Sequence, residues 1–299
     1  MTTRRRVLTI LAGAAALPVI GTHASTSPTQ WRGIALGAEA RIILDHPKSD
    51  ALISSVVEEI HRLENIFRLY NSNSQISQLN RNGVLYQPAF EMIELLSICS
   101  ALNSRTSGTF DPTIQSLWAL YAQTYSRGAH PEPEQISGAL KLTGWDKVRF
   151  SNDQISFDRA GVKLTLNGIA QGYIADTIAD MFHHAGVRNV LINTGEIVGL
   201  GMAPDGADWQ IKIKGDPNTT LPLSNGAVAT SSPLGTTLDT NGSVGHILDP
   251  RSGLVAGEWS QVSVVDKSAA VADGLSTAFC LMNKGDIDLC RGSGQVILS

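Results

Sequence analysis

The chain has 299 residues, enough for one large domain or two ordinary ones, with a substantial buried core. Its 42% hydrophobic and 17% charged residues are typical of a globular protein and exclude a disordered, collagen-like or coiled-coil chain. The formal net charge of −4 argues against nucleic acid or an anionic membrane surface as partner, because both attract a basic face. A nucleotide is compatible with this charge, since a metal ion and backbone N–H groups can neutralise its phosphates.

The first 24 residues have the order of an export signal. Arginines at positions 4–6 precede an apolar run over residues 10–20, and a small-x-small sequence ends at Ala24. The apolar run is too short to span a bilayer. The paired arginines resemble the twin-arginine signal, which exports proteins that have already folded; a general secretory signal with a basic start is the alternative. We therefore expect a periplasmic location and a single domain over residues 25–299.

Hydrophobic periodicity predicts the secondary structure in chain order. Helices are expected from a cap at Asp50 to Phe67, over 89–103, from Pro112 through Trp118, over 133–142, over 169–184 and over 270–282. Short strands are expected over 147–150, 154–157, 162–166, 190–192, 209–213, 227–229, 246–248 and 261–265. Because these elements interleave without the regular alternation of a doubly wound sheet, the sequence predicts the α+β class.

Four segments combine small residues with polar groups at junctions where helix N-termini can meet phosphate. They are 166–176, 108–113, 228–232 together with 245–253, and 272–278. In the last of them Asp273 and Thr277 share one helix face, and their hard oxygens suit Mg²⁺. Taken singly, each segment has an ordinary structural explanation, such as tight strand–helix packing, a helix start or a first-turn acid. The glycine-rich segment matches neither a phosphate-binding loop with Gly-Lys-Ser/Thr nor the dinucleotide fingerprint.

In this order the segments resemble the ApbE family, the FAD:protein FMN transferases. The family pattern includes Phe-Asp-Pro-Thr, a glycine-rich loop before a tyrosine, Ala-Thr-Ser, a His-Ile-Asp-Pro motif and Ala-Asp-x-Leu-x-Thr-Ala. The matching stretches, which cover nearly all of the chain after the signal, are 36–38, 69–80, 110–113, 168–173, 229–231, 246–253 and 272–278. The resemblance implies an α+β, mixed-sheet fold related to the T-fold, forming a single catalytic domain.

The resemblance also implies a reaction and roles for individual residues. FMN would be transferred from FAD to a Ser or Thr hydroxyl of an acceptor protein, with release of AMP. Asp273, Thr277 and the backbone carbonyl of Ala170 would hold Mg²⁺ against the FAD pyrophosphate, and His246 would be the general base. The acceptor is expected to be a flavoprotein subunit in the membrane that faces the periplasm. Residues expected to line the FAD site are Leu36, Tyr70, Thr109, Phe110, Asp111, Asn167, Gln171, Tyr173 and Ile247.

The chain departs from the family pattern at three places. Gln171 replaces the usual Lys, residues 36–38 read Leu-Gly-Ala in place of Met-Gly-Thr, and residues 194–197 read Thr-Gly-Glu-Ile where Gly-Gly-Asp-Ile is common. The metal and histidine positions are intact, so we expect activity with an altered affinity for FAD. No cysteine follows the apolar run, so no lipid anchor is expected. Together with the signal, this also resembles the NosX branch, which flavinylates a membrane regulator of nitrous-oxide reductase maturation. A Mg²⁺-dependent FAD pyrophosphatase that releases free FMN and AMP, and a periplasmic flavin-binding carrier, remain as alternatives.

Overall fold

The structure is a computed structural model that describes residues 28–213 and 219–299. The export signal expected over residues 1–24 lies outside the described residues. Within the described ranges, no helix combines the length and the apolar character needed to cross a membrane.

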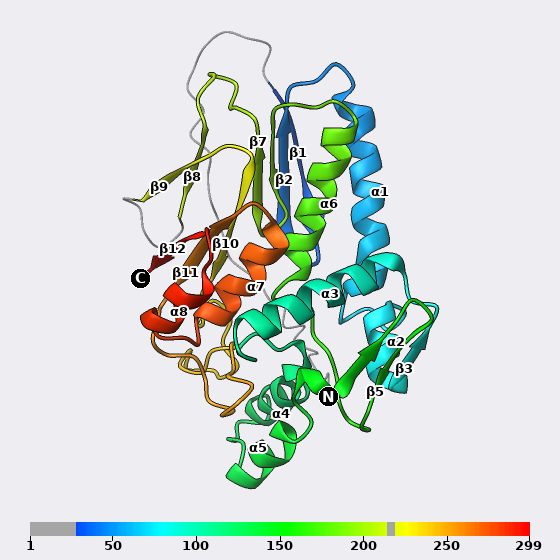
Figure 1. Ribbon diagram of the computed structural model, residues 1–299, viewed down its shortest axis with the longest axis vertical. Helices are drawn as coiled ribbons and strands as arrows, with labels where there is room; N and C mark the ends of the chain where they lie inside the picture. The colour runs from blue at the N-terminus through cyan, green and yellow to red at the C-terminus, as the bar shows by residue number, and fades with distance from the viewer. Residues whose placement is uncertain (1–27, 214–218) are drawn as a thin grey trace, which may run out of the picture.

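A seven-stranded sheet runs through the centre of the molecule (Figure 1). Its order is β1-β2-β6-β7-β10-β11-β12, and every neighbouring pair is antiparallel. The strands span Thr29–Ala35 (β1), Ala38–Leu44 (β2), Val190–Asn193 (β6), Ile197–Leu200 (β7), Gly226–Ser231 (β10), Val262–Asp266 (β11) and Gln295–Leu298 (β12). The α+β class is confirmed, but the expected mixed sheet is antiparallel, because consecutive strands such as β1 and β2, or β6 and β7, turn back on each other.

Helices cover one face of this sheet and a two-stranded hairpin covers the other. Alternation along β2 shows the division: Ile42 and Leu44 belong to the apolar cluster under the helices, whereas Ile43 joins the cluster under the hairpin. In Figure 1, α6 lies beside α1 on one side and α7 on the other. These elements span Ser49–Phe67 (α1), Ala170–His184 (α6), Ala269–Phe279 (α7), Lys284–Cys290 (α8), Trp209–Lys212 (β8) and Thr220–Leu223 (β9).

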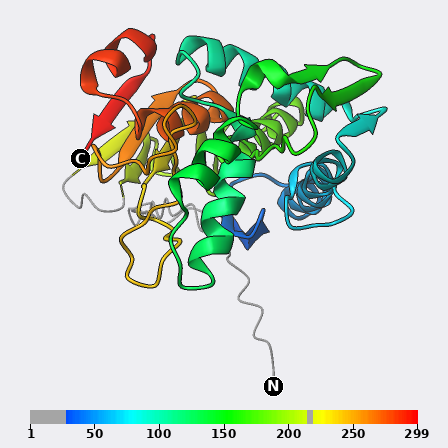
Figure 2. The same ribbon diagram turned by 90° about the horizontal axis from the view of Figure 1, so that it is seen from below.

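The remaining elements lie at one end of the sheet, in the lower part of Figure 1. They are Gln75–Asn82 (α2), Val84–Tyr86 (β3), Phe90–Arg105 (α3), Gln115–Tyr125 (α4), Pro133–Leu140 (α5), Val148–Phe150 (β4) and Gln154–Phe157 (β5), with 3-10 helices at Pro112–Ile114 and Trp145–Lys147. Helices α4 and α5 pack with the loop 235–255 around a separate apolar cluster that includes Leu117, Tyr121 and Leu248 (Figures 1 and 2). This cluster places the loop that carries His246 against α4.

Three sequence expectations are wrong in detail. Lys48 is the N-cap residue of α1, so Asp50 lies inside the first turn and caps nothing. Residues 162–166 form no strand, because a side chain takes the place of a partner strand. The Asn80 amide donates to the Leu164 carbonyl (2.8 Å) and accepts from the Leu164 amide (2.7 Å). Residues 246–248 form a loop whose only bridge, among the described residues, pairs Leu248 with Val255.

Candidate functional site

A cavity of about 440 Å³ lies where α4, α7, β10 and the loop 232–250 meet. Its volume falls in the usual range for small-molecule sites. All four segments that the sequence singled out contribute to its wall. The predicted site residues that line it are Thr109, Phe110, Asp111, Asn167, His246, Ile247, Asp273 and Thr277.

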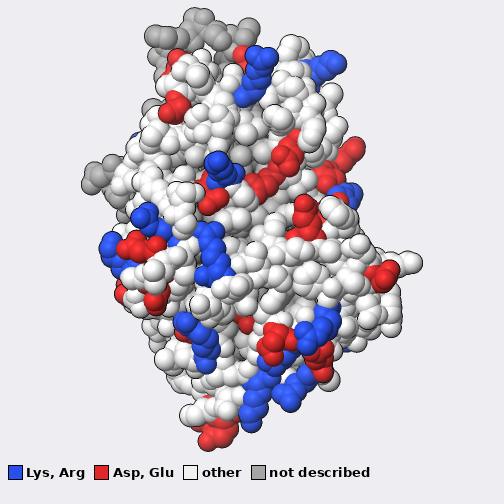
Figure 3. Space-filling model, viewed as in Figure 1, with Lys and Arg blue, Asp and Glu red and all other residues white. Residues whose placement is uncertain are grey.

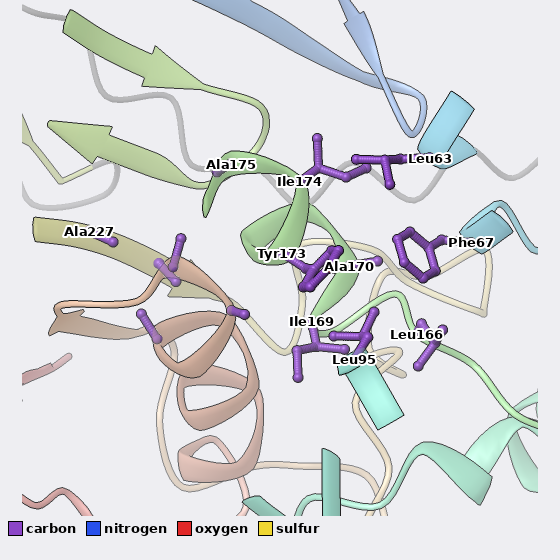
Figure 4. Packing of buried hydrophobic residues seen from close by; sticks show 14 of the residues in the cluster. Leu63, Phe67, Leu95, Leu166, Ile169, Ala170, Tyr173, Ile174, Ala175 and Ala227 are labelled. Atoms are coloured by element: carbon purple, nitrogen blue, oxygen red, sulfur yellow. The ribbon is translucent and has the colours of Figure 1, made fainter. Parts of the chain in front are cut away.

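Several predicted FAD contacts lie outside the cavity wall. The Tyr173 ring packs edge-on against Phe67 at 5.5 Å, and its hydroxyl donates to Glu94, so this side chain faces the apolar core (Figure 4). Leu36 lies in the β1–β2 turn, where its amide donates to the Glu64 carboxylate at 2.7 Å. Tyr70 is 57% exposed at the surface. The structure therefore does not bring these side chains to the cavity.

The start of α6 lies directly against the cavity side of α7. The Gly172 amide donates to Asp273 Oδ2 at 3.2 Å, and a Cβ atom placed on Gly168 would lie 2.9 Å from Thr277 Oγ1. Ala170, the third residue of the predicted metal site, lies in the chain between these two glycines and is buried. The three predicted metal ligands are thus neighbours, while the part played by the Ala170 carbonyl stays a prediction.

Gln171, which replaces the family lysine, is buried beside the turn between β6 and β7. A Cβ atom on Gly195 would lie only 2.5 Å from Gln171 Nε2, so the amide group occupies the space over that glycine. The Thr194 hydroxyl donates to the Gln171 backbone carbonyl at 3.3 Å. This side chain therefore supports the turn that presents Glu196 and is not part of the cavity wall.

Two buried carboxyl groups meet inside the cavity, on Asp273 and Glu196. The pKa of Asp273 is raised to about 7, mainly by burial and partly by the nearby charge of Asp176, against the lowering effect of the Gly172 hydrogen bond. Burial, followed by the charge of Asp273, holds the pKa of Glu196 well above its ordinary value. Asp111 lies in the same wall, and burial raises its pKa as well. No Lys or Arg lines the cavity within the described ranges.

These residues fit a hard divalent cation. A cavity that contains carboxyl groups and no cationic side chain offers a diphosphate no positive charge, which a bound cation would supply. A carboxylate, a hydroxyl and a backbone carbonyl suit Mg²⁺, which keeps water or substrate oxygen at its other positions.

The segment 108–111 places one unpaired polar atom in the wall. Thr109 is only 2% exposed, and its hydroxyl oxygen has no hydrogen-bond partner among residues 28–213 and 219–299. The segment is held from behind, where Asn103 Nδ2 donates to the Phe110 carbonyl at 2.8 Å. Asp111 accepts from the amide (2.9 Å) and the hydroxyl (2.6 Å) of Thr113 and so caps the short 3-10 helix. An unpaired buried hydroxyl beside a cavity is a position where a bound ligand would restore a hydrogen bond.

His246 lines the same cavity and has a defined tautomer. Its Nδ1 atom is 3.2 Å from the Pro233 carbonyl and 3.1 Å from the Thr236 carbonyl. Because both neighbours can only accept, Nδ1 carries the proton and Nε2 retains a lone pair. Burial lowers the pKa of His246 below its ordinary value of 6.5. The imidazole is therefore neutral at pH 7 and able to accept a proton.

The ApbE family model matches residues 36–295 of this chain. The chain belongs to the ApbE family. Relatives named FAD:protein FMN transferase include one from Chlamydia muridarum, which is 28% identical over 274 residues, covering 85% of this chain and 84% of the relative. Another, from Vibrio cholerae, is 24% identical over 282 residues, covering 89% and 80%. The crystal structure of the apo form of the Pseudomonas stutzeri flavinyl transferase ApbE is similar, with a TM-score of 0.81 at 26% identity and a coverage of 93% of this chain and 94% of that one.

The ApbE-like fold predicted from the motifs is thus confirmed, yet some residues of the cavity were not predicted as site residues. Glu196 was noticed only as a departure from the family pattern, although a buried carboxyl next to Asp273 shapes the charge of the site. Thr230 and Ser231 line the cavity too, and they belong to the Ala-Thr-Ser motif, which had indicated this segment but not these two side chains. Trp118 also lines the cavity, and nothing in its helical pattern distinguishes it from a core residue.

Proposed function

We propose that this chain is an exported, Mg²⁺-dependent FAD:protein FMN transferase. The transferase activity rests on family membership and on relatives that carry this name. The single structural observation that supports it best is the cavity itself, whose wall contains a neutral His246 together with the buried Asp273 and the half-buried Thr277. A proton acceptor in the same cavity as a place for a cation is what an attack by a hydroxyl on a diphosphate requires.

In the proposed reaction, one phosphorus–oxygen bond replaces another. The Nε2 atom of His246 takes the proton of a Ser or Thr hydroxyl on the acceptor. The hydroxyl oxygen bonds to the phosphorus of the FMN half, and the bond between that phosphorus and the bridging oxygen breaks, releasing AMP. Asp273, Thr277 and the Ala170 carbonyl would hold Mg²⁺, which when bound neutralises charge on the diphosphate and the leaving AMP. The unpaired Thr109 hydroxyl would bind a polar atom of FAD.

We also place the protein in the periplasm, with a membrane-bound flavoprotein subunit as acceptor. The support for this is the order of the first 24 residues, with paired arginines before an apolar run. Replacing Arg4 and Arg5 by Lys should keep the protein in the cytoplasmic fraction if the twin-arginine route is used, because that signal depends on the arginine pair. Unchanged appearance in the periplasm would favour the general secretory route. The membrane regulator flavinylated by the NosX branch is the first acceptor to test.

The activity is tested by incubating the mature chain with FAD, Mg²⁺ and a candidate acceptor. Transfer predicts flavin fluorescence on the denatured acceptor in a gel, one FMN adduct by mass spectrometry, and AMP in equal amount. Free FMN and AMP with an unlabelled acceptor would favour the pyrophosphatase, and retained FAD without AMP would favour the carrier. The Asp273→Ala variant, checked for an unchanged circular dichroism spectrum, should give neither adduct nor AMP.

A further inference from the structure

Three hydroxyl groups form a continuous chain in the cavity wall between β10 and α7. Ser276 Oγ donates to the Asp273 backbone carbonyl at 2.9 Å. Ser231 Oγ lies 2.7 Å from Ser276 Oγ and 3.3 Å from Thr277 Oγ1. Ser276 is fully buried, while Ser231 and Thr277 reach the cavity.

Counting protons fixes the direction of this chain. A carbonyl can only accept, so the single hydroxyl proton of Ser276 lies in the hydrogen bond to the Asp273 backbone carbonyl. Ser231 must then be the donor to Ser276, which uses the single proton of Ser231. The remaining contact can form only if Thr277 donates to Ser231. Each hydroxyl thus points its O–H bond along the chain, from Thr277 through Ser231 to Ser276 and the Asp273 carbonyl.

The usual partner of a helical threonine is not the one used here. A threonine inside a helix commonly donates to the carbonyl four residues earlier, as Thr106 does to Leu102 at 2.7 Å. For Thr277 that carbonyl belongs to Asp273, which already accepts the Ser276 hydroxyl. The alternative acceptor within reach is Ser231, on the neighbouring strand.

We propose that Ser231 and Ser276 are positioning residues that turn the Thr277 hydroxyl proton away from the cavity, so that its oxygen faces the cavity purely as an acceptor. A hydroxyl in this state suits a cation and cannot donate to a phosphate oxygen. The inference rests on the proposed function, because it assigns to Thr277 the part of a cation ligand. It also explains why a serine on β10, far from Thr277 in the sequence, belongs to the site.

The test measures cation binding and not turnover. Mn²⁺ is titrated into the metal-free mature chain and free Mn²⁺ is followed by electron paramagnetic resonance. Ser231→Ala is expected to weaken binding roughly 10- to 100-fold, the usual effect of removing a group that orients a ligand. Ser231→Thr keeps the hydroxyl and should bind within a few-fold of the natural protein. Ser276→Ala should weaken binding to a similar extent, because Ser231 is then free to donate to Thr277.

A matched control comes from Ser263 on β11, the partner of Thr230, which is the residue next to Ser231 on β10. The hydroxyls of Thr230 and Ser263 form a second buried pair at 2.9 Å, outside the chain described above. Ser263→Ala therefore removes a comparable hydrogen bond and should leave Mn²⁺ affinity unchanged. The double variant Ser231→Ala/Ser276→Ala should lose no more affinity than the weaker-binding single variant, since both act through one oxygen. Additive losses, or equal losses for Ser263→Ala, would overturn the proposal.

Thr277→Val separates this inference from the proposed function. If Thr277→Val binds Mn²⁺ normally, the cation site itself is wrong. If Thr277→Val weakens binding while Ser231→Ala does not, the cation site stands and only the hydroxyl chain is overturned. Unfolding temperatures of all variants, measured without cation, show whether a loss of affinity reflects a loss of fold.

Discussion

The half-buried side chain of His246 has Nδ1 bonded to two carbonyls, while its Nε2 has no hydrogen-bond partner among the described residues. We expect His246→Ala to slow transfer roughly 10²- to 10⁴-fold, the usual contribution of a positioned base, with FAD affinity little changed. Because burial lowers the pKa of His246, the base is lost only below pH 6.5. At Mg²⁺ concentrations high enough to keep Asp273 ionised, plots of kcat/KM from pH 5 to 8 should therefore show an acid limb with a midpoint below that value. His246→Ala should lack this limb; a midpoint above 6.5, or the same limb in the variant, would contradict the assignment.

The raised pKa of Asp273 predicts how the stability of the protein depends on pH when divalent cations have been removed. This pKa is raised from 3.8 to about 7 by burial, so the folded state binds a proton that the unfolded state has released. The free energy of unfolding should therefore decrease as the pH rises from about 4 to about 7 and then level off. Asp273→Asn should reduce this slope, and Glu196, whose pKa shifts the same way, accounts for what remains. Urea unfolding in EDTA at pH 5 and pH 8 measures the difference.

The matched control for Asp273 is an acid whose pKa moves in the opposite direction. Hydrogen bonds from Val244 and Ser243 lower the pKa of Asp239 to about 2. Its contribution to stability is present above pH 4 and is lost only as the pH falls toward 2, so Asp239→Asn should not change the slope between pH 5 and pH 8. Added Mg²⁺ should stabilise the natural protein and Asp239→Asn, but not Asp273→Asn. Equal slopes in the natural protein and Asp273→Asn would show that this carboxyl is not buried as described.

Single residues also show where sequence reasoning succeeds and where it stops. Asp273, Thr277 and His246 belong to ordered motifs, and the structure brings all three to one cavity. Tyr173 belongs to a motif too, but its neighbour Gly172 faces α7 while the tyrosine packs against Phe67. The motif gives no orientation, because the face that a helix residue presents depends on what packs around the helix.

The long helices were predicted well, whereas several short elements were missed. The spacing of apolar residues identifies α1, α3, α6 and α7 within a few residues of their observed ends. The hairpin of β1 and β2 was missed, because β2 has both faces covered and its apolar run at 42–44 lacks the alternation of a half-exposed strand. Residues 162–166 do alternate, yet Asn80 replaces the partner strand. Pairing over a long sequence separation is not encoded in a local pattern.

The contact between α6 and α7 gives a prediction for two helical glycines. A Cβ atom on Gly172 would lie 2.3 Å from the Ala269 carbonyl oxygen, so Gly172→Ala must push α7 away. We expect a loss of about 1–3 kcal/mol in the free energy of unfolding, as for other overpacked sites, together with weaker Mn²⁺ binding because Asp273 moves with α7. Gly138 on α5 has open space around its Cβ position, so Gly138→Ala should stabilise by roughly 0.4–1 kcal/mol. Similar stability for the two variants in urea would contradict the close contact.

Across the whole molecule, charge does not mark the site, but the arrangement of the apolar clusters does. On the face shown in Figure 3, acidic and basic side chains are interspersed and no broad field of one sign is seen. The cavity lies instead at a boundary, since α7 belongs to the central cluster while Leu248 and α4 belong to the smaller one. Composition could not reveal this boundary, because the two clusters draw on segments that alternate along the chain.

A ligand in this boundary should couple the two clusters, and hydrogen exchange can detect that coupling. FAD and Mg²⁺ added to His246→Ala, in which turnover is slow, should raise protection in α4, in residues 246–253 and in α7 together, because binding closes contacts that local opening would break. The Tyr121 hydroxyl, which donates to the Gly253 carbonyl at 2.7 Å, links α4 to that loop. The β8–β9 hairpin packs on the other face of the sheet and should exchange at the same rate with and without ligand. Protection confined to α7 would mean that FAD does not reach the wall formed by α4, and equal protection of the hairpin would mean a general stabilisation in place of binding at this boundary.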